Sequence, residues 1–260
     1  MPFKEVERVI YKKNPVINAI CQFRFPSILK IDSEIPVEFQ NKIIKRFPLY
    51  NEKIEITHQF GLPSTPDLLS QLSSKSTSQK NHEFLTEENH FKINLTRNFI
   101  TLSTSKYEKW ETFLGALTFV LSQFNEIYSP PYFSRIGLRY IDVFKKSSLN
   151  LTDKKWMDLI KPEFLGLLSS DCCDNIESYE STSEIKLADN ISMVRLVTSL
   201  VKDPENNEVF FMADSDFYNT QKSVYCDSWE KLNFLHDRAT RLIRCIIKED
   251  LHLAMEPEKL

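Results

Sequence analysis

The sequence predicts an α+β fold made of two related halves, each an antiparallel sheet with one long amphipathic helix packed on one face. Short segments in which apolar and polar residues alternate predict the strands, and two long segments with apolar residues every three or four positions predict the helices. The order strand, acidic helix start, Trp and long helix occurs at 91–127 and again at 208–251, which indicates an internal duplication. We place the halves at residues 1–148 and 149–260, together in one compact unit.

The first half is expected to place several strands before its long helix. These elements are a strand at 17–25, a short helix at 36–46, a strand at 54–60, a loop at 63–80 and a hairpin with strands at 91–95 and 99–103. The long helix follows the capping-box pattern Ser105-x-x-Glu108 and stops at Pro130-Pro131. A further strand at 133–144 completes the half.

The second half begins with a predicted helix at 152–168 and continues into an antiparallel meander. The strands of the meander are expected at 179–187, 191–201 and 208–218. A closing helix at 227–251 starts with Asp227 and Glu230 at its N-cap and N3 positions. Helices on only one face leave the other face of the sheet to solvent or to a partner.

The composition disfavours several classes of function. The 260 residues carry a net charge of −3, which argues against coating nucleic acid by bulk charge. Only 4 glycines are present, and the sequence has no P-loop, no dinucleotide-binding motif and no Gly-x-Ser-x-Gly. We therefore predict no cofactor and no catalytic residue.

The cysteines and the apolar segments indicate a compartment. Five cysteines form no C-x-x-C pair, and the first residues lack the apolar core of a signal peptide. No window approaches 18 uninterrupted apolar residues, so no membrane span is expected. These features predict a cytoplasmic protein.

Several segments carry a resemblance to a known family. They are Tyr11-x-x-Asn14-Pro15, Cys21-Gln22-Phe23-Arg24-Phe25-Pro26, Phe133-Ser134-Arg135-Ile136-Gly137-Leu138-Arg139-Tyr140-Ile141, Asp214-Ser215-Asp216-Phe217 and Leu232-x-x-Leu235-His236. Over nearly its whole length the chain resembles a sporadically distributed, functionally uncharacterised family of prokaryotic proteins of about this length. The resemblance implies no catalytic assignment. Because patchy distribution is typical of horizontally exchanged genes, it implies a mobile-element or antiphage-defence context.

Arginines on predicted strands form one candidate binding site. Alternation places Arg135 and Arg139 on one sheet face with Gly137 between them, where a planar anion or a backbone could approach. Arg24 and Arg195 could join them. The alternative is an internal ion-pair network in which these arginines pair with nearby acids, with Asp142, Glu184 and Asp214 as the candidates.

A second candidate is a basic stripe on the closing helix. Its members, spaced three, three and four residues apart, are Arg238, Arg241, Arg244 and Lys248. The spacing predicts a continuous stripe away from the apolar face, suited to phosphates or to an acidic protein surface. The alternative is an ordinary solvated helix face.

Asp214-x-Asp216 is the weakest candidate. Two carboxylates on one strand face could contribute to a magnesium site, but spacing identifies no third acid, so pairing with arginine or turn capping is favoured. The five histidines show no spacing typical of zinc ligands. We predict no metal site.

These observations favour a non-catalytic macromolecular binding protein whose arginine-bearing face or basic helix docks another copy of the chain or a separate protein. The 19 Phe and 9 Tyr support this function, because surplus aromatic residues often mark interfaces. Two alternatives remain open: a nucleic-acid-binding factor that uses the basic stripe, and a metal-dependent nuclease-like enzyme that uses Asp214 and Asp216.

Overall fold

The structure, a computed structural model, describes residues 3–58, 76–171 and 173–259. It confirms an α+β fold with one large antiparallel sheet. The strands of this sheet are β2 (Val16–Arg24), β3 (Leu49–His58), β4 (Ser76–Leu85), β5 (Phe91–Leu95), β6 (Phe99–Thr104), β7 (Arg135–Phe144), β8 (Glu180–Lys186), β9 (Met193–Lys202) and β10 (Val209–Asn219). Within the described residues they lie in the order β3-β4-β5-β6-β2-β7-β10-β9-β8.

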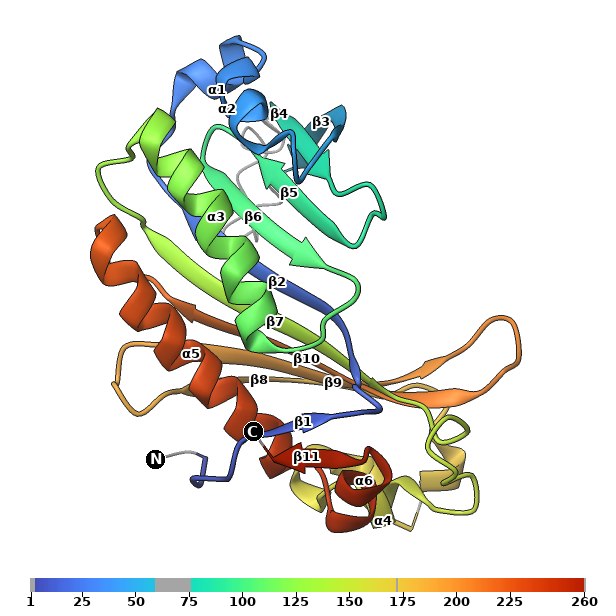
Figure 1. The fold of residues 1–260 in the computed structure, drawn as a ribbon. Helices are drawn as coiled ribbons and strands as arrows, with labels where there is room; N and C mark the ends of the chain where they lie inside the picture. Colours follow the sequence, from blue (N-terminus) through green and yellow to red (C-terminus); the bar gives the residue numbers. More distant parts are fainter. Residues whose placement is uncertain (1–2, 59–75, 172, 260) are drawn as a thin grey trace, which may run out of the picture.

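Two long helices cover one face of the sheet (Figure 1). The helices are α1 (Leu29–Ser33), α2 (Val37–Ile43), α3 (Trp110–Tyr128), α4 (Trp156–Leu159), α5 (Tyr225–Ile246) and α6 (Glu249–Ala254). Figure 1 shows α3 and α5 lying across the same face, and α5 packs on β7 and β10. Within the described ranges, no helix combines the length and the apolar character that crossing a membrane requires.

Alternation along β7 explains why one sheet face is covered and the other is charged. Ile136 and Leu138 point into the core, where they are almost fully buried, while Arg135 and Arg139 project from the other face. The core side also holds Phe23 of β2 and aromatic residues of the helices in one continuous cluster. The charged residues therefore lie on the face opposite α3 and α5.

The middle of the sheet is formed by β2 and β7, which pair antiparallel. β6 lies beside β2 and is followed by α3, whereas β10 lies beside β7 and is followed by α5. The predicted boundary between residues 148 and 149 falls just after β7, so one uninterrupted sheet contains strands from both sides of it.

A small sheet that the sequence did not predict joins the two ends of the described chain. β1 (Val9–Tyr11) pairs antiparallel with β11 (Pro257–Lys259). Two backbone bonds extend this pairing, from Lys12 N to Glu256 O at 3.2 Å and from Lys13 N to Met255 O at 3.1 Å. This sheet fixes β1 beside the end of α5 (Figure 1).

The prediction of one helix at 152–168 was wrong. α4 is followed by two short 3-10 helices, Pro162–Phe164 and Gly166–Ser169. Pro162 has no N–H to donate, and Gly166 adopts a positive φ of 51°, so an α-helix cannot continue through either position.

The closing helix and both predicted helix starts also differ from expectation. α5 ends at Ile246, because Ile247 is extended and forms a β-bridge with Ile160, and α6 then follows. No side chain caps α3 at Lys109 or α5 at Val224, so the predicted capping residues do not act as caps.

The structure extends the strands on either side of the predicted loop at 63–80. β3 starts before the predicted strand at 54–60, of which residues 59 and 60 lie outside the described residues. Residues 76–80, predicted as loop, belong to β4, and 63–75 lie outside the described residues. A ten-residue strand of polar composition gives little apolar alternation to detect.

Candidate functional sites: a charged sheet face and a cavity beneath helix α5

Two diagonal ion pairs dominate the uncovered sheet face. Arg135 Nη2 donates to both carboxylate oxygens of Asp216, at 2.9 and 2.7 Å. Arg139 binds Asp214 through two nitrogens, with Nε donating to Oδ1 at 2.7 Å and Nη2 donating to Oδ2. The hydrogen bonds to Asp214 raise the pKa of Arg139 above its ordinary value. Arg135 and Arg139 therefore form internal ion pairs, which was the alternative to an anion-binding site.

The space above Gly137 is already occupied. A Cβ added at Gly137 would collide with the guanidinium of Arg135, which lies over this position. Arg135 Nη1 also donates to Gln22 Oε1 at 3.1 Å. The glycine therefore admits the chain's own arginine, where the sequence suggested close approach of an external anion or backbone.

The other two candidate arginines on this face are exposed. Arg24 donates to Gln22 at 3.1 Å and lies opposite Arg135 in the register of β2 and β7. Arg195 lies between Asp216 on β10 and Glu184 on β8. Among the described residues, neither arginine has an acid within ion-pair distance. Both keep their charge available at the surface.

One row of charges runs across four strands of this face. The registers place Arg139, Asp216, Arg195 and Glu184 side by side on β7, β10, β9 and β8. We call these four residues the charge row. Their signs alternate along the row, beginning with a positive charge on β7 and ending with a negative charge on β8.

The four basic residues of the predicted stripe do not form a continuous exposed surface, and the last of them, Lys248, lies beyond the end of α5. Arg238 is only 8% exposed, with its guanidinium 4.6 Å from the ring centroid of Phe234. Arg241 contacts Asp237 at 3.0 Å, and Arg244 contacts Glu249 at 3.4 Å.

The last member of the predicted stripe is also engaged. Lys248 Nζ donates to Met157 O at 2.6 Å, which ties the end of α5 to α4. Contacts with acidic residues and burial thus leave less positive charge exposed on the helix surface than the spacing of the four residues suggested.

The predicted acidic pair is held by arginines. Asp214 and Asp216 each accept two hydrogen bonds from a guanidinium. In the part of the chain that the structure describes, no group of three or more His, Cys, Asp or Glu residues has the geometry to hold a metal ion.

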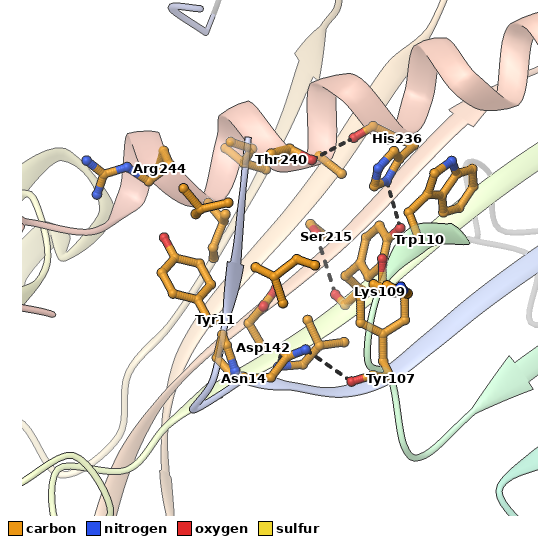
Figure 2. A pocket seen from close by; sticks show the side chains of 18 of the residues that line it. Tyr11, Asn14, Tyr107, Lys109, Trp110, Asp142, Ser215, His236, Thr240 and Arg244 are labelled. Atoms are coloured by element: carbon orange, nitrogen blue, oxygen red, sulfur yellow. Dashed lines mark hydrogen bonds between the residues drawn. The ribbon is translucent and has the colours of Figure 1, made fainter. Parts of the chain in front are cut away.

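A cavity of about 100 Å³ lies on the opposite face of the sheet, beneath α5. Figure 2 shows residues from four parts of the chain lining it. α5 contributes His236 and Thr240, and the sheet contributes Asp142. Tyr11 comes from β1, and Tyr107 comes from the loop before α3. Aromatic and aliphatic side chains form most of the remaining wall.

Asp142 is the most unusual residue of the cavity. It is 5% exposed, and no described residue donates a hydrogen bond to its carboxyl group. Burial, with a smaller contribution from the negative charge of Asp214, raises its pKa to about 7. A carboxyl group without a partner in such surroundings is close to half ionised at neutral pH.

Three tyrosines surround Asp142. Its charge contributes to the raised pKa of Tyr11, Tyr107 and Tyr140, although burial is the main cause for each. The hydroxyl group of Tyr11 is bonded to His252 Nδ1 at 2.8 Å. The ring of Tyr107 meets that of Tyr140 edge-on, with centroids 5.4 Å apart.

His236 closes the cavity on the α5 side. Its ring stacks on Trp110, with centroids 4.0 Å apart and planes 8° from parallel, and its Nδ1 is bonded to the Tyr140 hydroxyl at 3.1 Å. Nε2 is buried without a hydrogen-bond partner in the described part of the chain. Burial lowers the pKa of His236 to about 3, so the ring is neutral near pH 7.

Sequence reasoning did not identify this cavity, although signals for it exist. Asp142 shares the buried face of β7 with Leu138 and Tyr140. The alternation of the predicted strand already places this acidic residue among apolar ones, which is unusual because charged residues are rarely buried without a partner. Tyr11, Asn14, Tyr140 and His236 all lie in sequence segments quoted above, and all line the cavity.

Comparisons with protein-family models, with curated proteins and with solved structures find no match to this chain.

Proposed function

We propose that this chain is a non-catalytic binding protein that pairs with a second copy of itself through the uncovered sheet face. The observation that carries the proposal is the alternating charge row, Arg139, Asp216, Arg195 and Glu184. The signs along the row are plus, minus, plus, minus. If a second copy faces the first with its row running in the opposite direction, each positive charge lies opposite a negative one. A two-fold axis between Asp216 and Arg195 would bring every charge opposite one of the other sign.

The dimensions of the face agree with those of a stable interface. Five strands, β8, β9, β10, β7 and β2, span about 24 Å across the sheet, and ten residues of a strand extend about 33 Å. The resulting area of roughly 800 Å² per copy equals the usual contribution of one partner to a specific complex. Half-exposed apolar residues between the charges, such as Met212 and Tyr218, would be buried there.

Nearly balanced charge favours a protein partner over nucleic acid. Arg135 and Arg139 are offset by Asp216 and Asp214, and a phosphate backbone would need an excess of positive charge that this face lacks. The same two ion pairs give little support to the nuclease alternative, because the two carboxylates that would bind metal already accept hydrogen bonds from arginines.

The strand order supports the proposed internal duplication. In each unit a central strand pairs with the strand that precedes the long helix: β2 with β6 before α3, and β7 with β10 before α5.

We also propose a cytoplasmic location for this protein. The family resemblance implies a mobile-element or antiphage-defence context.

Reversing one exposed charge of the row tests self-association. Arg195→Glu should abolish dimer formation or weaken it by about tenfold or more, because it places like charges opposite each other without breaking an internal ion pair. Size-exclusion chromatography with light scattering, over a range of protein concentrations, measures the effect.

Lys202→Glu is the matched control, because it makes the same charge change at an exposed position at the end of β9, away from the row. The control should dimerise like the parent protein. A parent that stays monomeric at all concentrations, or an Arg195→Glu variant that dimerises as the parent does, contradicts the proposal. Nucleic acid that co-elutes with the parent would favour the alternative.

A further inference from the structure

The cavity beneath α5 contains a buried carboxyl group that no described residue pairs with. Asp142 lies deep in the cavity, 5% exposed, and in the described part of the chain no cation lies within ion-pair distance of it. Two arginines line the cavity, but each contacts another acid: Arg8 with Glu111 at 2.8 Å, and Arg244 with Glu249 at 3.4 Å. Unpaired carboxylates are rare in protein interiors, because removing the charge from water is costly.

The walls around Asp142 suit an organic cation. The faces and edges of Tyr107 and Tyr140 enclose one side of the cavity, and aromatic rings attract positively charged groups. Val16, Ala213 and Ile243 supply an aliphatic surface next to the carboxyl group. His236 is neutral near pH 7, so it adds no competing positive charge.

The size of the cavity limits the ligand. A volume of about 100 Å³ exceeds by several-fold the roughly 10–15 Å³ that one water molecule needs on the same measure. The space therefore admits a molecule of roughly seven to ten non-hydrogen atoms.

We infer that this cavity binds a small protonated amine, with Asp142 as the counter-ion of the ammonium group and the aromatic and aliphatic walls around its apolar body. The amine would donate hydrogen bonds to the buried carboxyl group of Asp142, which accepts none from the described residues. This binding site lies on the opposite side of the sheet from the charge row and does not depend on self-association.

Benzylammonium and its neutral analogue benzyl alcohol test the inference. Isothermal titration calorimetry on the parent protein should show binding of benzylammonium and at least about tenfold weaker binding of benzyl alcohol, as expected for the loss of a buried charge-assisted hydrogen bond. Asp142→Asn should remove this preference. Glu180→Gln, which removes an exposed carboxylate of β8 outside both the cavity and the charge row, should keep it.

A second variant keeps the inference testable if Asp142→Asn does not fold. Ala239→Leu leaves Asp142 intact and adds volume from α5 into the cavity, so it should weaken benzylammonium binding by about tenfold or more. Failure of the parent to bind benzylammonium at millimolar concentration overturns the inference. Retained preference for the ammonium in Asp142→Asn, or unchanged binding in Ala239→Leu, also overturns it.

Discussion

At the scale of single residues, Asp142 and Asp189 show how surroundings decide what a carboxylate does for stability. Asp142 has no hydrogen-bond donor among the described residues, and burial raises its pKa to about 7. Asp189 accepts hydrogen bonds from the backbone of Ile191 and from the backbone and side chain of Ser192. Its pKa is lowered from its ordinary value by these bonds, against the opposing effect of partial burial.

Asp142→Asn should make the protein more stable relative to the parent as pH rises. Since the folded pKa is above the unfolded value of 3.8, the unfolded chain releases its proton first, and the parent loses stability as pH increases toward 7. Asn has no proton to release, so the variant does not lose stability in this way. The unfolding free energy of Asp142→Asn minus that of the parent should therefore grow by about 2–3 kcal/mol between about pH 5 and about pH 8. Urea denaturation at both pH values measures it.

Asp189→Asn provides the contrast. Its carboxylate is stabilised in the folded state, so the variant should be less stable than the parent at about pH 8. A pH-independent difference between Asp142→Asn and the parent would mean that the Asp142 carboxyl group is not held in the unfavourable surroundings described.

Residue patterns predicted the direction of many side chains and favoured the pairing of Asp214 and Asp216 with arginines, but they did not predict the contacts of the basic residues on α5. Alternation placed Arg135 and Arg139 on one face, as observed, because the strand period is fixed by the backbone. Spacing on α5 did not reveal that Arg238 would be buried and Arg241 would contact Asp237, because these contacts depend on how the helix packs and where its neighbours' side chains reach.

At the scale of elements, Gly115 is an exposed glycine inside α3. An added Cβ would meet nothing within 4 Å, so Gly115→Ala should increase the unfolding free energy by about 0.5–1 kcal/mol through helix propensity alone. Gly166→Ala is the opposite case. Gly166 has a φ of 51°, which a residue with a side chain adopts at a cost, so this substitution should lower the unfolding free energy. Urea denaturation of the two variants should give shifts of opposite sign; a loss of stability in Gly115→Ala would contradict the description of α3.

Strands and long helices could be predicted because their periodicity is regular and local. β2, β5, β6 and β7 lie within a residue or two of the predicted ranges. α3 and α5 fall on the two predicted amphipathic stretches, although α5 ends before the predicted residue 251. The helix predicted at 152–168 failed at Pro162 and Gly166, where local backbone restrictions outweigh apolar spacing.

At the scale of the whole molecule, both candidate sites depend on contacts between distant segments. The charge row needs the neighbours β7, β10, β9 and β8, and the cavity needs β1 to be held beside α5 by its pairing with β11. Sequence periodicity fixes neither strand order nor the pairing of three-residue strands at opposite ends of a chain. The residues of the charge row could therefore be named singly from the sequence, whereas their grouping and the cavity could not be predicted.

Sedimentation equilibrium of the parent protein at low and high salt most directly tests the central claim that the charge row pairs two copies. We expect an average mass near twice the 30.5 kDa of the chain at low salt, falling toward a single chain as screening weakens the contacts between opposite charges. A mass of one chain at every salt concentration and protein concentration would contradict the claim.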